Sequence, residues 1–247
     1  MNNEFKEIKI ENLTANYFEA NVFENFNATL PAKGCVCFFG PSGCGKTTLL
    51  QIIAGLKAPL SGIVYAENNK QEFIDNTKSN NMKALTILSK SSEINKKKNF
   101  LFNISQIGNR ENQNKNLLKI AYVFQEDRLI PWLTALENVS LITPKNSAMI
   151  WLEKVGLPGE ESKYPSQLSG GMKQRVNIAR ALAFDAPVIL LDEPFKGLDD
   201  AAKLQIIEIL NELKKDRLLL LVTHDQEDIS LLADNTICMP LNTSSNV

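Results

Sequence analysis

The sequence Gly40-Pro41-Ser42-Gly43-Cys44-Gly45-Lys46-Thr47-Thr48 fits the pattern G-x-x-x-x-G-K-[ST] without a mismatch. The short apolar run from Gly34 to Phe39 precedes this loop and is typical of a buried strand. The run from Thr48 to Gly55 follows it and is typical of a helix that ends at a glycine. In this context, between a strand and a helix, the pattern predicts a loop that binds phosphate groups.

The residue types in this loop suit ATP and Mg²⁺. Its three glycines allow the backbone to curl so that successive N–H groups face phosphate oxygens, and the following helix N-terminus favours the same anion. Lys46 is placed to reach the β- and γ-phosphates, and the Thr47 hydroxyl is placed to bind Mg²⁺. We therefore predict that residues 40–48 bind the nucleotide. For Cys44 two alternatives stay open: a thiol whose pKa is lowered by the N–H groups, or an inert loop residue.

Length, charge and cysteine content limit the possible functions. A chain of 247 residues can form one α/β domain with a small subdomain, and its net charge of −1 gives no sign of a nucleic-acid partner. The longest apolar run, Leu218 to Val222, is too short to span a bilayer, and the N-terminus lacks the apolar core of a signal peptide. We therefore expect a cytoplasmic protein, with no regulatory domain after His224. Cys35 and Cys37 share one face of a strand and are expected to pack as small apolar residues.

The chain is expected to form a single domain over residues 5–241, built from distinct segments. Residues 5–33 contain short apolar runs, interrupted at Asn12 to Asn16, that predict an antiparallel β lobe. Residues 66–116 are rich in asparagine and lysine and predict an inserted surface segment, either a tolerant loop or a docking or regulatory insert. Amphipathic stretches within residues 130–185 predict a helical subdomain.

Apolar strands alternate with helices in the last part of the chain. Strands are predicted at 188–192, 218–223 and 237–241, and helices at 201–213 and 226–233. This alternation predicts a parallel sheet covered by helices. The first of these strands ends in Asp192-Glu193. Downstream of a phosphate loop, this pair is typical of an ATPase, in which Asp192 binds Mg²⁺ and Glu193 polarises the attacking water.

The stretch Leu168-Ser169-Gly170-Gly171-Met172-Lys173-Gln174-Arg175 resembles the signature motif of the ATP-binding cassette (ABC) family. In physical terms it is a second anion site, with a serine hydroxyl and two glycine N–H groups at a helix N-terminus. The resemblance implies a P-loop NTPase (RecA-like) fold and a head-to-tail dimer, most simply a homodimer. In that dimer the Ser169-Gly170-Gly171 segment of one subunit closes over the γ-phosphate held by the other.

The resemblance also assigns roles to single residues. Tyr17 matches the aromatic residue that stacks on adenine, although a tyrosine in a β lobe can also serve packing alone. Gln125 matches the glutamine that senses Mg²⁺ and the attacking water, and Asp199 matches the loop that contacts the partner subunit. His224, the only histidine of the chain, matches the switch histidine that contacts the γ-phosphate. The long insert departs from the family pattern, and so does Lys196, which stands where a small residue is more common.

The segment from Val123 to Thr134 looks like the corresponding part of importer ATPases for nitrate, sulfonates, taurine and similar small solutes. Pro131-Trp132 would offer a rigid aromatic surface for docking on a membrane subunit; the alternative is a buried tryptophan that braces the lobe. The resemblance implies an ATPase peripheral to the inner face of the cell membrane, with separate permease subunits and, indirectly, an extracytoplasmic solute-binding protein. An exporter ATPase, or a soluble ABC ATPase outside transport, remains the alternative.

Overall fold

The computed structural model describes residues 5–17, 20–68 and 118–239. The chain forms two compact units. One consists of Met1–Ala32, Gly40–Ile120 and Met239–Val247, and the other of Lys33–Phe39 and Ala121–Cys238. The phosphate loop and the β lobe belong to the first unit, whereas the second unit contains the parallel sheet and the helical segment.

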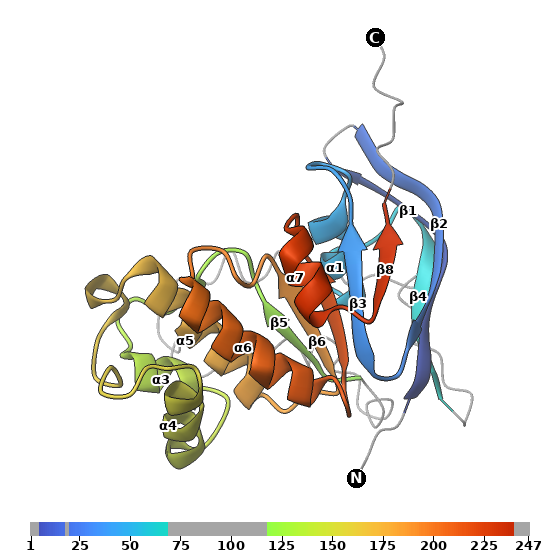
Figure 1. The fold of residues 1–247 in the computed structure, drawn as a ribbon. Helices are drawn as coiled ribbons and strands as arrows, with labels where there is room; N and C mark the ends of the chain where they lie inside the picture. Colours follow the sequence, from blue (N-terminus) through green and yellow to red (C-terminus); the bar gives the residue numbers. More distant parts are fainter. Residues whose placement is uncertain (1–4, 18–19, 69–117, 240–247) are drawn as a thin grey trace, which may run out of the picture. The chain divides into compact units, whose positions relative to one another are not determined.

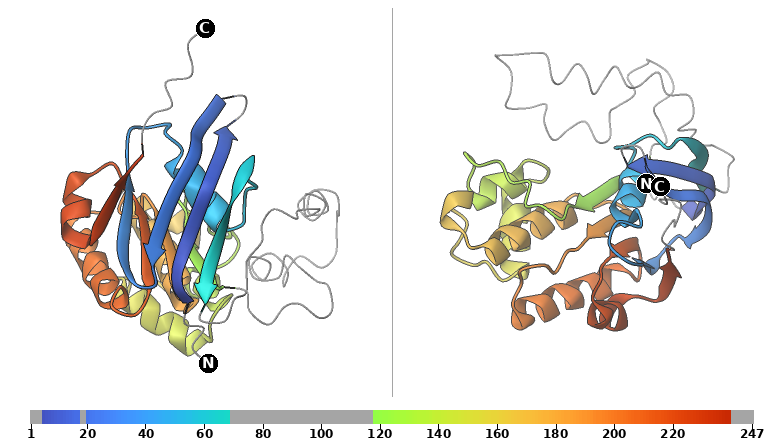
Figure 2. Two further views of the ribbon diagram at one scale, coloured as in Figure 1. Left: turned by 90° about the vertical axis from the view of Figure 1, so that its right-hand side faces the viewer. Right: turned by 90° about the horizontal axis from the view of Figure 1, so that it is seen from above.

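The first unit contains an antiparallel sheet in the order β2-β1-β4 (Figure 2). Its strands are β1 (Phe5–Tyr17), β2 (Ala20–Pro31) and β4 (Ser61–Asn68). The expected interruption at Asn12 to Asn16 is wrong, because β1 continues through these residues. Its pairing with β2 shifts register between Ile10 and Leu13, where Asn12 has a φ of 49°. Asparagine tolerates this left-handed conformation, so the chain forms bulges instead of ending the strand.

The predicted helix is present as α1 (Lys46–Ile53), but it begins within the predicted nucleotide-binding residues 40–48, two residues before the expected start at Thr48. Its N-cap, Gly45, has a φ of 95°, which favours glycine. A Cβ atom at this position would also lie only 2.9 Å from Cδ1 of Phe23. Conformation and space therefore both require glycine at the start of this helix.

The second unit contains a sheet in the order β5-β6-β7-β3-β8 (Figure 1). Its strands are β3 (Gly34–Phe39), β5 (Ile120–Val123), β6 (Val188–Asp192), β7 (Leu218–Val222) and β8 (Asn235–Cys238). The pairs β6–β7, β7–β3 and β3–β8 are parallel. All residues of β6 and β7 are buried, which explains their continuous apolar sequences. The predicted parallel sheet is confirmed, although β8 begins two residues earlier than expected.

The described part of the second unit also contains six helical segments. They are α3 (Ala135–Ser140), α4 (Lys145–Lys154), the 3₁₀ helix η1 (Pro165–Gln167), α5 (Gly170–Ala183), α6 (Asp200–Leu213) and α7 (Gln226–Leu232). Figure 1 shows α3, α4 and α5 gathered together, and their apolar side chains join one core with the sheet. Thr134 and Glu137 form the predicted capping box of α3. The helical segment expected within residues 130–185 is thus present.

The predicted polar insert begins as strand, because residues 66–68 belong to β4. The rest of it, apart from this start, lies outside the described residues. Across residues 5–17, 20–68 and 118–239, no helix combines the length and apolarity that a bilayer span requires.

Candidate functional site

The phosphate loop is closed around the amino group of Lys46. Its Nζ atom donates hydrogen bonds to the carbonyl oxygens of Gly40 (2.7 Å) and Pro41 (2.9 Å). Gly43 and Gly45 have φ angles of 83° and 95°, in the left-handed region that glycine adopts without strain. A Cβ atom on Gly40 would lie 2.5 Å from the carbonyl oxygen of Met239. The curled backbone predicted from the glycine spacing is therefore present, with its lysine in place.

The cysteines near this loop are buried. Cys44 is 1 % exposed, which favours the inert alternative over a reactive thiol. Cys35 and Cys37 are fully buried in β3 and pack as predicted. Burial raises the pKa of the Cys35 thiol to about 12.

Asp192 ends β6 and is almost completely buried, at 2 % exposure. The hydroxyl of Tyr122 on β5 donates a hydrogen bond of 3.2 Å to its Oδ2 atom. Burial and the Asp192 carboxylate raise the pKa of Tyr122, so the hydroxyl keeps its proton. The Tyr122 ring stacks on Phe124 with centroids 4.0 Å apart, and the guanidinium of Arg128 lies 4.1 Å from the Phe124 centroid. Tyr122 was not predicted as a site residue, because its position within an apolar strand carries no signal for this contact.

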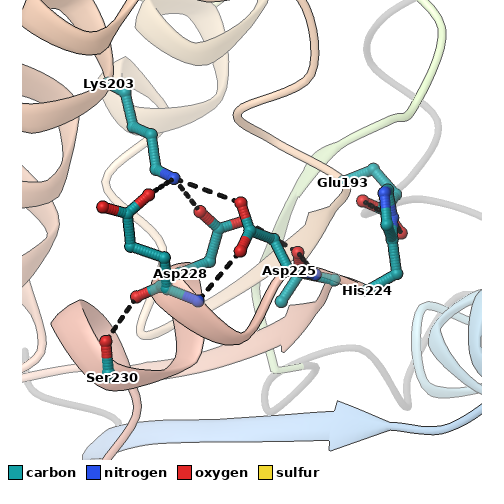
Figure 3. A network of polar contacts seen from close by, with 8 residues as sticks. Glu193, Lys203, His224, Asp225, Asp228 and Ser230 are labelled. Atoms are coloured by element: carbon teal, nitrogen blue, oxygen red, sulfur yellow. Dashed lines mark hydrogen bonds and ion pairs between the residues drawn. The ribbon is translucent and has the colours of Figure 1, made fainter.

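Glu193 and His224 form a hydrogen-bonded pair at the ends of neighbouring strands (Figure 3). The Nδ1 atom of His224 lies 2.9 Å from Oε1 and 3.0 Å from Oε2 of Glu193. This hydrogen bond and the charge of Glu193 raise the pKa of His224. Glu193 has a φ of 48°, an unusual conformation for a glutamate. Such strain is concentrated at functional sites.

The signature motif leads into α5 with its polar groups exposed. Ser169 is the N-cap of this helix, and its hydroxyl accepts a hydrogen bond of 3.2 Å from the Met172 N–H. Ser169 and Gly170 are exposed. A Cβ atom on Gly171 would lie 2.7 Å from the carbonyl oxygen of Gly197, so only glycine allows the first turn of α5 to pack this closely on the loop that contains Gly197.

Helix α5 is also hydrogen-bonded to two segments that carry predicted site residues. The Gln174 Nε2 atom donates to the carbonyl oxygen of Pro194 (3.0 Å), directly after Glu193. The Asn177 Nδ2 atom donates to the carbonyl oxygen of Phe124 (3.2 Å), directly before Gln125. The signature helix therefore holds both segments, through Gln174 of the motif itself and through Asn177, which was not predicted as a site residue.

The remaining predicted residues occupy varied positions. Gln125 and Lys196 are exposed. Asp199 is the N-cap of α6, and its Oδ1 atom accepts a hydrogen bond of 2.8 Å from the Ala202 N–H. Tyr17 is the last residue of β1, and the side chain on which its stacking role depends lies outside the described part.

The segment that carries Trp132 is held by a buried asparagine. Trp132 is 66 % exposed, which contradicts the alternative of a buried tryptophan bracing the lobe. Asn138 on α3 is fully buried, and its amide bonds to the Ile130 N–H and to the carbonyl oxygens of Ile130, Leu133 and Thr134 at 2.8–3.2 Å. This preorganised turn presents an aromatic side chain to solvent.

The predicted site residues are divided between the two units. Residues 40–48 belong to the first, and Gln125, Asp192, Glu193 and His224 belong to the second, as does the Ser169-Gly170-Gly171 segment. Within the described ranges, no group of three or more His, Cys, Asp or Glu side chains could hold a metal ion.

Comparison with known proteins identifies the family. Residues 23–196 match the ABC transporter family, so the chain belongs to it. The predicted family and fold class are thus confirmed.

Similar curated proteins have transport names. An aliphatic sulfonates import ATP-binding protein of Rhodococcus jostii (strain RHA1) is 34 % identical over 227 residues, which cover 90 % of this chain and 75 % of that protein. A bicarbonate transport ATP-binding protein of Synechocystis sp. (strain PCC 6803) is 32 % identical and covers 97 % of this chain and 76 % of that protein.

Similar solved structures are ABC cassettes. A dimeric bacterial ABC transporter cassette superposes with a TM-score of 0.71 at 30 % identity, covering 94 % of each chain. A dimeric ATP-binding cassette in a post-hydrolysis state bound to ADP and Pi gives a TM-score of 0.69 at 28 % identity, again over 94 % of each chain.

Proposed function

We propose that the chain is the ATP-binding and ATP-hydrolysing subunit of an ABC importer. The observation that carries this proposal is the Glu193–His224 pair: a strained glutamate next to a buried aspartate, bonded to the only histidine of the chain. Membership of the ABC transporter family and the import and transport names of its relatives support the same function.

The nucleotide would be held mainly by residues 40–48. The amides of the loop and the Lys46 ammonium would bind the β- and γ-phosphates, and Tyr17 would stack on the adenine. Thr47, Asp192 and Gln125 would hold Mg²⁺. This small set of hydroxyl, carboxylate and amide oxygens suits an ion that keeps several waters and binds through phosphates. When bound, Mg²⁺ neutralises charge on the β- and γ-phosphates.

Hydrolysis would rest on the Glu193 carboxylate and His224. Glu193 would orient a water molecule toward the γ-phosphorus and accept its proton as the water attacks. His224 lies within hydrogen-bond distance of that carboxylate, so the imidazole can donate a hydrogen bond to it or turn toward a γ-phosphate oxygen. The β–γ bond then breaks, and ADP and phosphate leave.

The complete catalytic unit would be a dimer, most simply a homodimer. The Ser169-Gly170-Gly171 segment, of which Ser169 and Gly170 are exposed, and the exposed Asp199 of one subunit would face the nucleotide of the other. The dimeric state of both similar solved cassettes supports this arrangement.

The partners outside the dimer would be integral membrane permease subunits. The exposed Trp132, held on a turn by Asn138, supplies the rigid aromatic anchor that such docking uses. The subunit would be peripheral on the inner face of the cell membrane, and a solute-binding protein would act with it only indirectly. The transported solute would belong to the small-anion group of nitrate, sulfonates and bicarbonate.

The Glu193→Gln variant tests the proposed function. It removes the base but keeps the size of the side chain, so we expect ATP hydrolysis to fall by at least about a hundredfold. Size-exclusion chromatography with Mg²⁺-ATP should then show a trapped dimer, and adding Ser169→Arg should abolish that dimer. Glu208→Gln, an exposed change on α6, is the matched control and should leave both readouts unchanged. Hydrolysis by Glu193→Gln at the wild-type rate would refute the assigned role.

A further inference from the structure

A network of charged side chains lies beside the catalytic pair and has no part in the chemistry described above. Lys203 on α6 directs its Nζ atom toward three carboxylates of the segment 225–228 (Figure 3). The distances are 2.6 Å to Asp228, 2.8 Å to Glu227 and 3.4 Å to Asp225. The Lys203 and Asp228 side chains are only 12 % and 6 % exposed, so their ion pair is shielded from solvent.

The network holds both neighbours of His224. The Thr223 hydroxyl donates a hydrogen bond of 2.7 Å to the Oδ2 atom of Asp228, whose Oδ1 atom faces Lys203. Asp225, on the other side of His224, faces the same ammonium directly. In addition, the Asp225 N–H donates to the Thr223 hydroxyl (3.1 Å). The side chains on both sides of His224 are therefore held by one cation, Asp225 directly and Thr223 through Asp228, while the imidazole itself is 75 % exposed and bonds to Glu193.

The Lys203 ammonium belongs to a residue in the first turn of α6. The Lys203 N–H donates to the carbonyl oxygen of Asp199 at 2.9 Å, and the Asp199 side chain caps the same turn. A displacement of the Asp199 loop would thus move the ammonium that holds residues 223 and 225. Contacts this short and buried transmit small shifts, because packed interiors deform little.

We propose that Lys203 is a positioning residue that couples the Asp199 loop to His224, by way of Asp228 and Thr223. The proposal rests on the proposed function, in which His224 serves hydrolysis and Asp199 faces the second subunit. Under this proposal, when a second copy of this chain contacts Asp199 of one subunit, the position of His224 in that same subunit changes. Lys203 itself touches neither ATP nor the reacting water.

The single histidine allows a direct test. In the full chain labelled with ¹³C,¹⁵N-histidine, the Cε1–Hε1 group of the His224 imidazole gives a single NMR cross-peak that needs no assignment, because the chain has one histidine. We expect Lys203→Met to move this cross-peak by more than its line width, without nucleotide present, and Lys203→Arg to return it most of the way. The matched control is Lys215→Met, which removes an exposed lysine paired with Glu212 at 2.8 Å and should leave the cross-peak unchanged.

Steady-state kinetics supply the second readout. Lys203→Met should lower kcat for ATP hydrolysis by about tenfold with less than about a twofold change in KM, because a misplaced catalytic group slows the chemical step more than binding. Lys203→Arg should recover at least half of kcat. A Lys203→Met variant with a lower melting temperature but a wild-type cross-peak and kcat would overturn the proposal and leave Lys203 a purely structural role.

A double variant covers the case in which Lys203→Met fails to fold, since that change leaves the buried Asp228 carboxylate without its cation. Lys203→Met with Asp228→Asn removes both charges and keeps the side-chain sizes. It should still displace the cross-peak and lower kcat, and wild-type values in the folded double variant would refute the coupling. If the wild type hydrolyses no ATP, the proposed function fails, whereas the nucleotide-free cross-peak still decides whether Lys203 positions His224.

Discussion

The backbone of Glu193 should be strained, and two substitutions can measure that strain. Its φ of 48° lies in the left-handed region. The other non-glycine residues with positive φ in the described ranges are Asn12, Asn25 and Asp185, whose types tolerate this region. Glu193→Ala keeps the Cβ atom and therefore the strain, whereas Glu193→Gly removes it. Both variants lose the carboxylate and its bond to His224, so their difference isolates the backbone contribution.

The expected difference follows from two opposing effects. A Cβ atom in the left-handed region costs about 1–2 kcal/mol, and glycine adds about 0.5–1 kcal/mol of unfolded-state entropy. Relief of strain should win, so Glu193→Gly should be more stable than Glu193→Ala by about 0.5–1 kcal/mol. For a chain of this length that corresponds to a melting temperature higher by roughly 1–4 °C.

Thermal unfolding followed by circular dichroism at one scan rate measures this difference. Glu208, exposed within α6, provides the control, because there glycine should be less stable than alanine by about 1 kcal/mol and the sign should reverse. If Glu193→Ala melts at or above Glu193→Gly, the left-handed backbone is not strained and the reasoning is refuted. Both Glu193 variants should also lack ATPase activity.

Two further predictions concern His224 and Trp132. The bond to Glu193 raises the pKa of His224 in the folded state. The bond therefore contributes its full stabilisation below the unfolded-state pKa of about 6.5, and this stabilisation is lost as the pH rises through the higher folded-state pKa. The free energy of unfolding of the wild type minus that of His224→Gln, measured by urea unfolding, should therefore be larger at pH 6 than at pH 9, by less than about 1 kcal/mol for so exposed a pair; an equal difference at both pH values would contradict the raised pKa. Trp132→Ala should weaken co-purification with co-expressed membrane permease subunits, while ATPase activity of the isolated subunit and its melting temperature stay unchanged; undiminished association would exclude Trp132 as an anchor.

Much of the fold could be predicted because buried strands have apolar residues at successive positions, and this pattern is visible in the local sequence. The strands 188–192 and 218–222 are buried throughout and, apart from Asp192, consist of apolar residues, and the predicted bounds agree to within a residue. The capping box of Thr134 and Glu137 is equally local. The break predicted at Asn12 to Asn16 does not occur, because turn-forming residues in one strand of a long hairpin can produce bulges as well as breaks.

The supporting residues of the site could not be predicted in the same way. Tyr122 meets Asp192 across 70 positions of sequence, and Asn177 meets Phe124 across 53. Such contacts depend on where whole elements pack, and a tyrosine or asparagine in an apolar context has many other uses. The sign of φ at Glu193 is also invisible in the sequence, because glutamate gives no hint of a left-handed turn.

The position of Glu193 beside His224 is set by the pairing of the buried strands β6 and β7. In the parallel pairing of β6 with β7, Asp192 lies opposite Val222, and the Glu193 N–H donates to the Val222 carbonyl oxygen at 2.9 Å. The residues that follow, Glu193 on one strand and His224 on the other, are thereby brought to the same edge of the sheet. A slip of one residue in this register would turn every side chain of a strand to the opposite face. Because these strands, apart from Asp192, consist of buried leucine, isoleucine and valine, side-chain packing selects the register, and the position of Glu193 beside His224 follows from it.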